Sequence, residues 1–199
     1  MEKTGGRYWK IMTGDWWRVG LLVFVWLAAP GIILAADWRP LPDTGQAKCY
    51  DINGKEMTCP AVGQPLYGQD TQYQGVAPAY QDNGDQTVTD QNSGLIWMQA
   101  DDGTKRIWQD AVAYCNGLDF AGQSDWRLPI KFELDSIVDY GRSYPAVHSV
   151  FKCQSSFYWS ATIYLDDPAY AWGVYANDGG DHWLDKSNRY YVRCVRAGQ

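Results

Sequence analysis

The chain has 199 residues, with 17 Lys and Arg against 23 Asp and Glu, so its formal net charge at pH 7 is −6. This acidic balance argues against a nucleic-acid-binding protein, because such proteins gain much of their affinity from basic side chains that neutralise phosphates. The chain also contains 11 Trp, 14 Tyr and 20 Gly. That composition favours a loop-rich fold held together by aromatic clusters over a helical bundle.

Residues 1–36 have the pattern of a secretory signal. Basic residues precede an apolar stretch from Val19 to Ala36, and small residues lie at its end. The stretch is also long enough to cross a bilayer, although Pro30 and Gly31 interrupt its helix. We expect export with cleavage near Ala36, and an uncleaved membrane anchor is the alternative. Either way we expect the rest of the chain to be secreted, periplasmic or at the cell surface.

Residues 37–79 form an extension rich in Gly, Gln and Tyr. Asn53 and Gly54 give a strong two-residue hairpin signal, and Cys49 and Cys59 flank it. A disulfide between these two cysteines needs no long-range contact to form. The spacing therefore predicts a stapled hairpin in this extension.

The next block, "YQDNGDQTVTDQNSGLIWMQ", reads as two strands, 87–89 and 95–98, separated by turns. Its acidic residues Asp82, Asp85 and Asp90 suggest a calcium loop. Their spacing misses the D-x-[DN]-x-[DN]-G pattern and its closing Glu. We interpret these carboxylates as caps of the turns.

Two amphipathic helices follow. The first, in "TKRIWQDAVAYCNGLDF", has Thr104 as a candidate cap and places Cys115 on its apolar stripe. The second is predicted to run from Pro129 to Gly141. Its apolar face comprises Ile130, Leu134, Ile137 and Val138.

Three strand-like runs, 155–164, 169–178 and 190–196, come after the helices. The intervals "LDDP" and "GGDHWLDKSN" between them read as turns or exposed loops. Strands before and after a pair of helices indicate an α+β fold rather than a repeating βαβ fold.

All five cysteines lie beyond residue 36, and no two have the C-x2-C spacing of a zinc site. In an oxidising compartment they are disulfide candidates. Cys194 lies in the last apolar run, and its preferred partner is Cys115, which faces inward on the first helix. Closing this long loop is worth about 4 kcal/mol in the chain-entropy treatment. Cys153 is the rival partner of Cys194, and otherwise it is the unpaired cysteine.

The segments "DNGDQTVTDQNSGLIWMQ", "AVAYCNGL", "SDWRLPIKFELDSIVD", "YWSAT", "AYAWGVYANDG" and "YYVRCVR" resemble, in this order, the Lcl C-terminal domain family, named after a Legionella collagen-like adhesin. The resemblance covers about residues 80–197. It implies a C-type-lectin-like fold, with two helices packed on a small, twisted, mostly antiparallel sheet. Two positions depart from the family pattern. Ile130 replaces a Thr or Ser that would cap the second helix with Glu133, so we expect a weaker helix start. Ala161 replaces a Ser, and we expect this change to leave the strand intact.

Residues 175–191 are dense in the aromatic and polar side chains of recognition loops. We predict that this segment binds a glycan or protein ligand, without a metal, a cofactor or catalysis. The tryptophans Trp126, Trp159 and Trp172 are predicted to pack in the core. The candidate ligand-binding residues are Tyr175, Asn177, Asp178, Asp181, His182, Trp183, Asp185, Asn188 and Tyr190.

Three alternatives to a simple binding protein stay open. Cys153 near His148 suggests a thiol–base pair, but a cysteine five residues from a lone histidine is weak support for catalysis. The extension and the spare cysteine suit a homo-oligomeric subunit of an extracellular appendage or envelope layer. The resemblance also implies a variable protein of a diversity-generating retroelement, with residues 169–190 as its varied surface.

Overall fold

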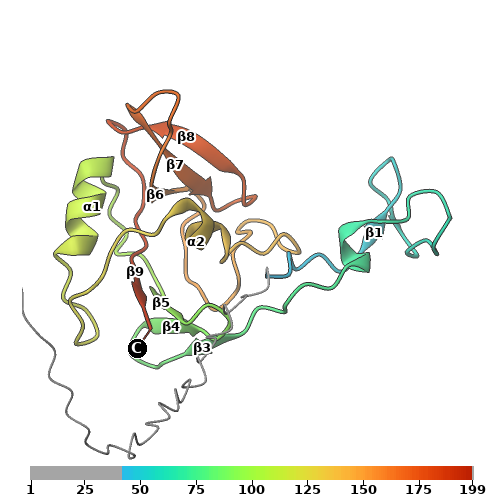
Figure 1. Ribbon diagram of the computed structural model, residues 1–199, viewed down its shortest axis with the longest axis horizontal. Coiled ribbons are helices and arrows are strands. Elements are labelled where there is room, and N and C mark those ends of the chain that lie inside the picture. Colours follow the sequence, from blue (N-terminus) through green and yellow to red (C-terminus); the bar gives the residue numbers. More distant parts are fainter. Residues whose placement is uncertain (1–41, 199) are drawn as a thin grey trace, which may run out of the picture. The chain divides into compact units, whose positions relative to one another are not determined.

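The computed structural model describes residues 42–198, which form an α+β fold with mostly antiparallel sheets. Figure 1 shows these elements and their order along the chain. The strands are β1 (Cys49–Tyr50), β2 (Glu56–Met57), β3 (Tyr80–Asp82), β4 (Thr87–Asp90), β5 (Leu95–Met98), β6 (Phe157–Ile163), β7 (Tyr170–Tyr175), β8 (Asp181–Asp185) and β9 (Val195–Ala197). The helices are α1 (Trp108–Asn116), α2 (Lys131–Asp135) and a 3-10 turn at Asp70–Gln72.

The strands of the main body form two sheets instead of the single sheet expected. One has the order β3-β4-β5-β9, so the closing strand β9 pairs with β5 near the start of the domain. The other has the order β6-β7-β8. A parallel bridge between Tyr158 and Tyr191 connects β6 to the segment that leads into β9. The last run therefore contacts both sheets.

Strand β8 was missed because its sequence, "DHWLD", carries charged residues at both ends. Trp183 lies directly opposite Trp172 of β7, and Leu184 lies opposite Ala171. Leu184 is buried while Trp183 is exposed. This inside–outside alternation is a strand signal, although the flanking Asp and Gly residues indicated a loop. The interpretation of this interval as a loop was wrong.

Both helices are shorter than expected. The first begins at Trp108, and Thr104 does not cap it. Arg106 exchanges two backbone hydrogen bonds with Tyr190, at 2.8 and 3.0 Å, which holds the preceding residues in an extended conformation. The second ends at Asp135 because Val138 forms a bridge with Val147 and must also be extended. In both cases the helical spacing of apolar residues continues beyond the helix, into residues that pair with another segment and are therefore extended.

The chain forms the disulfide Cys115–Cys194 and not the rival Cys153–Cys194. Its two Cα atoms are 5.6 Å apart, and both residues are fully buried between α1 and the segment before β9. Cys153 is an unpaired, half-buried cysteine. The covalent bond thus joins the first helix to the end of the domain.

Arg193, next to this disulfide, is buried with 1% exposure. Its guanidinium donates to the carbonyl oxygens of Met98 and Gln99, both at 2.6 Å, and to that of Lys152 at 2.7 Å. The rings of Phe151 and Tyr158 lie within 5.3 and 5.6 Å of the guanidinium carbon. Burial lowers the pKa of Arg193. Carbonyl oxygens from two segments, 98–99 and Lys152, therefore converge on one buried cation.

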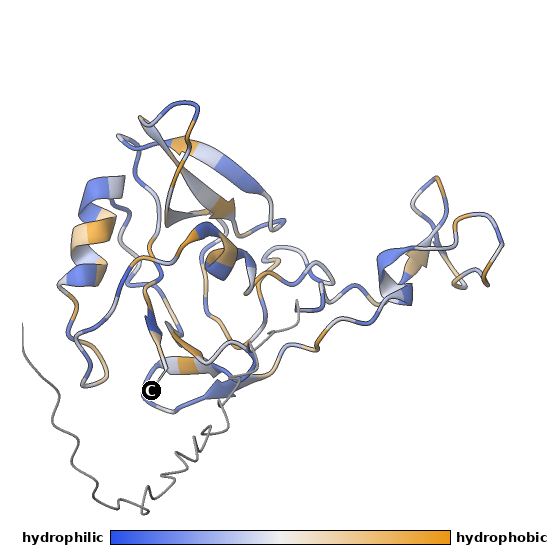
Figure 2. Cartoon of the chain, viewed as in Figure 1, coloured by the Kyte–Doolittle hydropathy of each residue, from blue (hydrophilic) through white to orange (hydrophobic). Residues whose placement is uncertain are grey.

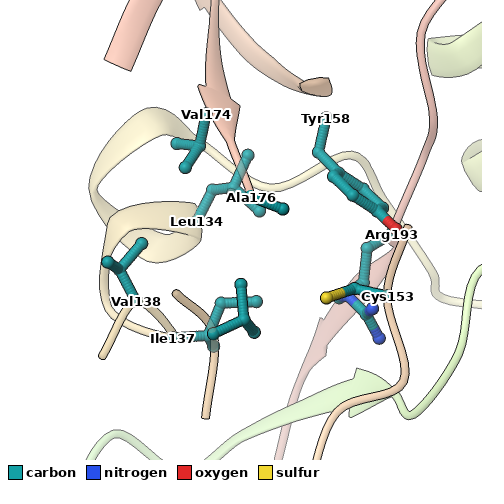
Figure 3. A pocket seen from close by; sticks show the side chains of 9 residues that line it. Leu134, Ile137, Val138, Cys153, Tyr158, Val174, Ala176 and Arg193 are labelled. Carbon is teal, nitrogen blue, oxygen red and sulfur yellow. The ribbon is translucent and has the colours of Figure 1, made fainter. Parts of the chain in front are cut away.

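A small cavity lies beside Arg193 (Figure 3). Its volume is about 10 Å³, and its walls are mostly apolar, from Leu134 and Ile137 to Val174. Figure 3 shows the sulfur of Cys153 directed toward these side chains. A space of this size is at the lower limit for one water molecule. It is a packing defect of the core and not a ligand pocket.

Residues 42–79 form an arm that has almost no core of its own. The disulfide Cys49–Cys59 staples β1 and β2, and Cys49 is the buried residue of this described stretch. Polar side chains supply the other contacts. The side-chain amide of Gln69 accepts the N–H of Tyr50 and donates to its carbonyl oxygen, both at 2.9 Å. The side-chain amide of Gln72 donates to the carbonyl oxygen of Pro60 at 2.7 Å. Figure 2 shows apolar positions along the arm's two loops. The arm is held by a staple and hydrogen bonds instead of hydrophobic packing.

Replacing both Cys115 and Cys194 with Ala is expected to lower the free energy of unfolding by about 4 kcal/mol, because the unfolded chain regains the freedom of a long loop. Tryptophan fluorescence in urea measures this loss, since residues 42–79 contain no tryptophan. Replacing both Cys49 and Cys59 is the matched control. The same unfolding curve should barely move, because the core clusters contain no residue from this part of the arm. Equal losses in both double variants would show that the arm and body unfold together.

Candidate ligand-binding face

One face of the β6–β7–β8 sheet carries exposed aromatic rings. Trp183 of β8 is 56% exposed and stacks on Tyr164 with ring centroids 5.5 Å apart and planes 18° apart. Trp172 meets both rings edge-on, at 5.5 Å from Tyr164 and 6.1 Å from Trp183. We call Phe132, Tyr164, Trp172 and Trp183 the aromatic face.

Lys131 of α2 lies at the centre of this face. Its ammonium is 5.3 Å from the ring centre of Phe132 and 5.5 Å from that of Trp172. The same ammonium pairs with the carboxylates of Asp181 at 2.6 Å and Asp135 at 2.8 Å. The face therefore combines flat apolar surface with hydrogen-bonding charge.

The two carboxylates beside Lys131 differ in their environment. Burial raises the pKa of Asp135, and the charge of Asp181 adds to this effect. The pKa of Asp181 is lowered, chiefly by its hydrogen bond to Lys131. Burial acts to lower the pKa of Lys131, but its bonds to the two carboxylates outweigh this and raise it. At neutral pH the favoured ion pair is Lys131–Asp181.

The start of α2 positions Lys131 without a side-chain cap. Ile130 offers no oxygen to the helix, as expected from the sequence, but other groups bind the free amides. The N–H of Lys131 donates to the hydroxyl of Thr162 in β6 at 2.9 Å, and the N–H of Ile130 donates to Glu133 at 2.9 Å. Arg127 in turn pairs with Glu133 at 2.6 Å. The hydroxyl missing at residue 130 is thus replaced by one from the sheet.

A second aromatic group lies on the opposite side of the same sheet. Phe157 stacks on Tyr175 with ring centroids 4.5 Å apart, and His182 and Tyr190 meet Phe157 edge-on at 5.3 Å. Tyr190 also packs against the buried Trp159 at 5.0 Å. Because successive side chains of a strand point to opposite faces, His182 and Trp183 are separated by the sheet. The structure therefore divides the predicted binding residues between two faces.

The remaining predicted residues belong to turns. Asp178 accepts the N–H of Gly180 at 2.9 Å, and Asp185 accepts the N–H of Ser187 at 2.8 Å. The amide of Asn177 donates to the hydroxyl of Tyr175 at 2.7 Å, and the backbone N–H of Asn188 bonds the carbonyl oxygen of Asp185 at 3.0 Å. These contacts shape the ends of the β7–β8 hairpin.

Of the nine predicted binding residues, Trp183 belongs to the aromatic face, and Asp181 pairs with Lys131 at its centre. Trp126 and Trp159 are buried as expected. Trp172 is not in the core, and that prediction was wrong: it is half-buried because its strand position places it beside Trp183. Sequence reasoning also missed Lys131, Phe132 and Tyr164. The alternation of "YAWGVY" and "DHWLD" could have placed Trp172 with Trp183, but no local signal connects Lys131 to them.

Other candidate sites have structural explanations. Asp82, Asp85 and Asp90 cap turns, accepting the N–H groups of Gly84, Thr87 and Asn92. Within residues 42–198 no group of three or more His, Cys, Asp or Glu residues is arranged to hold a metal ion. In that same range no helix has the length and apolar character needed to cross a membrane. The predicted signal segment lies outside the described residues.

The family model of the Lcl C-terminal domain matches residues 86–196, which is more than half of the chain. The chain belongs to the Lcl C-terminal domain family. The aromatic face, the disulfide Cys115–Cys194 and Arg193 all lie within the matched residues, whereas the arm lies outside them. A search of curated proteins found no match.

Replacing Asp181 with Asn is expected to lower stability at pH 7 by less than about 1 kcal/mol, because the ion pair is partly exposed. The pKa of Asp181 is lowered in the folded protein, so its contribution is present above the ordinary value of 3.8 and is lost as the pH falls through the folded value. In urea unfolding, the difference in free energy of unfolding between Asp181→Asn and wild type should therefore be smaller at pH 3 than at pH 7.

The matched control is Asp135→Asn. Because the folded protein raises the pKa of Asp135, its charge costs stability at pH 7 and not in acid. This variant should keep wild-type stability or gain slightly at pH 7. A larger loss at pH 7 for Asp135→Asn than for Asp181→Asn would contradict this assignment of the ion pair.

Proposed function

We propose that the protein is an exported, non-catalytic adhesion or binding protein whose aromatic face recognises a glycan or protein ligand. The observation that carries this proposal is the exposed stack of Trp183 on Tyr164 beside the ion pair of Lys131 and Asp181. Flat aromatic rings bind the apolar faces of sugar rings or of protein side chains. The neighbouring ammonium and carboxylate supply hydrogen bonds that fix orientation.

The face is also suited to recognition because it is ordered before a ligand arrives. Trp183 is held between Tyr164 and Trp172, and Lys131 is held by two carboxylates. Rigid aromatic side chains lose little conformational freedom on binding, which is why they are enriched at binding hot spots. This ordering supports the aromatic face over the turn residues as the main contact surface.

Two observations support a non-catalytic role. Burial raises the pKa of the Cys153 thiol, which opposes formation of the nucleophilic thiolate. His148 accepts the N–H of Val150 through Nδ1 at 3.3 Å, and burial lowers its pKa. Both groups are half-buried: Cys153 packs against the core, and His148 packs against the ring of Tyr80.

We further propose that the matched domain has the C-type-lectin-like arrangement. The antiparallel pairing of β5 with β9 brings the beginning and end of the domain together, and two helices flank the sheets. Two disulfides and family membership are compatible with an extracellular or periplasmic location.

A glycan array with wild type and Trp183→Ala tests the proposed function. Loss of the stacking ring is expected to weaken binding of the selected glycan at least about tenfold, or roughly 1.4 kcal/mol. His182→Ala is the matched control, because it removes an exposed ring from the neighbouring position on the opposite face. It should bind like wild type.

The reverse result, with His182→Ala impaired and Trp183→Ala unchanged, would move the site to the opposite face. Equal binding by all three proteins would remove both faces from the proposal. A folded-state check by near-ultraviolet circular dichroism separates lost binding from lost structure.

A further inference from the structure

The large exposed apolar side chains of residues 42–198 fall into two groups. There are twelve such side chains, and six of them lie in the arm, where Ile52 is 86% and Val62 is 78% exposed. The other half lie on or around the aromatic face, including Phe132 at 77%. The arm group comprises Tyr50, Ile52, Val62, Leu66, Tyr67 and Tyr73, and the face group comprises Ile130, Phe132, Tyr140, Tyr144, Leu165 and Trp183. Exposed apolar surface concentrated in this way marks interaction sites.

The face group lies near the aromatic face and at the turn end of the β7–β8 hairpin. Leu165 follows Tyr164, and Ile130 and Phe132 flank Lys131. At the turn end of the hairpin, the hydroxyl of Tyr140 donates to the carbonyl oxygen of Gly179 at 3.2 Å, and the N–H of Tyr144 donates to that of Asn177 at 2.9 Å. Exposed apolar residues therefore lie at both places, beside the aromatic face and at the turn end of the hairpin.

The arm is ordered although it buries almost nothing. Besides its staple, Asp51 accepts the N–H groups of Asn53 and Lys55, both at 2.9 Å, and so fixes the tip of the hairpin. A segment without its own core does not need six exposed apolar side chains for its stability. A preformed apolar surface instead lowers the entropic cost of docking to a partner.

The base of the arm is fixed to the body, which keeps the arm from folding back. The carbonyl oxygen of Thr44 accepts the N–H of Tyr140 at 2.7 Å, which joins the arm to the body. The N–H of Asp43 donates to the carbonyl oxygen of Val76 at 2.8 Å, which joins the two ends of the arm to each other. A Cβ added at Gly141 would lie 2.1 Å from the carbonyl oxygen of Gly45, so the two backbones are in direct contact. Tyr50 and Tyr140 line one pocket at the base of the arm, and the part of the arm beyond Tyr50 is left to reach a second copy.

We propose that residues 50–73 of the arm dock on the aromatic face of a second copy of this chain. This rests on the proposed function and names a protein partner for the same face. The contact is heterologous, joining two different surfaces, so repeated docking gives a chain or a closed ring of copies.

The areas on the two sides agree with this pairing. With about 150–250 Å² for each whole aromatic side chain, the exposed fractions of the face group give roughly 700 Å² of apolar surface, and the arm group gives a similar area. Together they approach the roughly 1,200–2,000 Å² that specific protein interfaces bury.

Charge disfavours the competing symmetric contact through the free edge of β8. Antiparallel pairing of two β8 strands centred on Trp183 would place Asp181 opposite Asp185 of the second copy. Like charges directly opposite each other destabilise a strand pair, and charged residues on edge strands prevent such pairing. On the face itself, Lys131 is already neutralised by its two carboxylates.

Mixing two variants tests the heterologous contact. The arm variant carries Ile52→Ser, Val62→Ser and Tyr73→Ser, and the face variant carries Phe132→Ala and Trp183→Ala. All five positions are exposed, so both variants should fold. In sedimentation velocity, purified wild type should form species larger than a dimer as its concentration rises. Each variant alone should associate at least about tenfold more weakly.

An equal mixture of the two variants should form a dimer and nothing larger, because one intact arm meets one intact face. His182→Ala should assemble like wild type. The proposal is overturned by a monomeric wild type, by an arm variant that assembles normally, or by a mixture that stays monomeric. A glycan array with the arm variant separates the two proposals, because this variant keeps an intact aromatic face. If the arm variant binds glycan normally and also assembles normally, the arm contact is contradicted while the proposed function stands.

Discussion

The segment Tyr191–Arg196 is the constraint on which the rest of the fold depends. Within a few residues it pairs with β6, buries the guanidinium of Arg193 and forms the disulfide with Cys115. It then enters β9 beside β5. Each contact joins this segment to a different part of the chain. Because a terminal strand without such ties frays, these contacts determine whether the two sheets form one domain.

The same constraint explains how a binding face is displayed. With the 190–196 segment covering one edge of β6, the β7–β8 hairpin is left with a free outer edge and an exposed side. The segment 137–147 and α2 cover part of that side through Leu134 and Val138, which pack against Val174. The uncovered part carries Trp183 and Tyr164, and Lys131 at the start of α2 lies beside them. The aromatic face therefore combines the part of the sheet that Leu134 and Val138 leave open with the first turn of α2.

Much of this architecture could be predicted from local sequence patterns. The arm hairpin, the inward phase of Cys115 and the strands around Trp97 and Trp159 depend on near neighbours in the chain. The start of the first helix and the end of the second could not be predicted, because Arg106 pairs with Tyr190 far along the chain and Val138 pairs with Val147 instead of continuing the helix. The binding face was predicted only in part for the same reason. Lys131 joins Asp181 across 50 residues of sequence, and the strand that carries Asp181 and Trp183 was hidden by its charged ends.

The most direct test of the aromatic face as the recognition surface is the indole N–H spectrum of ¹⁵N-tryptophan-labelled protein. The indoles of Trp108, Trp126 and Trp159 donate to backbone carbonyl oxygens and provide internal references. On addition of a glycan selected by array, or on raising the protein concentration, the signals of Trp172 and Trp183 should shift while these three stay in place. Shifts at Trp108 or Trp126 with an unchanged Trp183 would place recognition elsewhere and contradict the account.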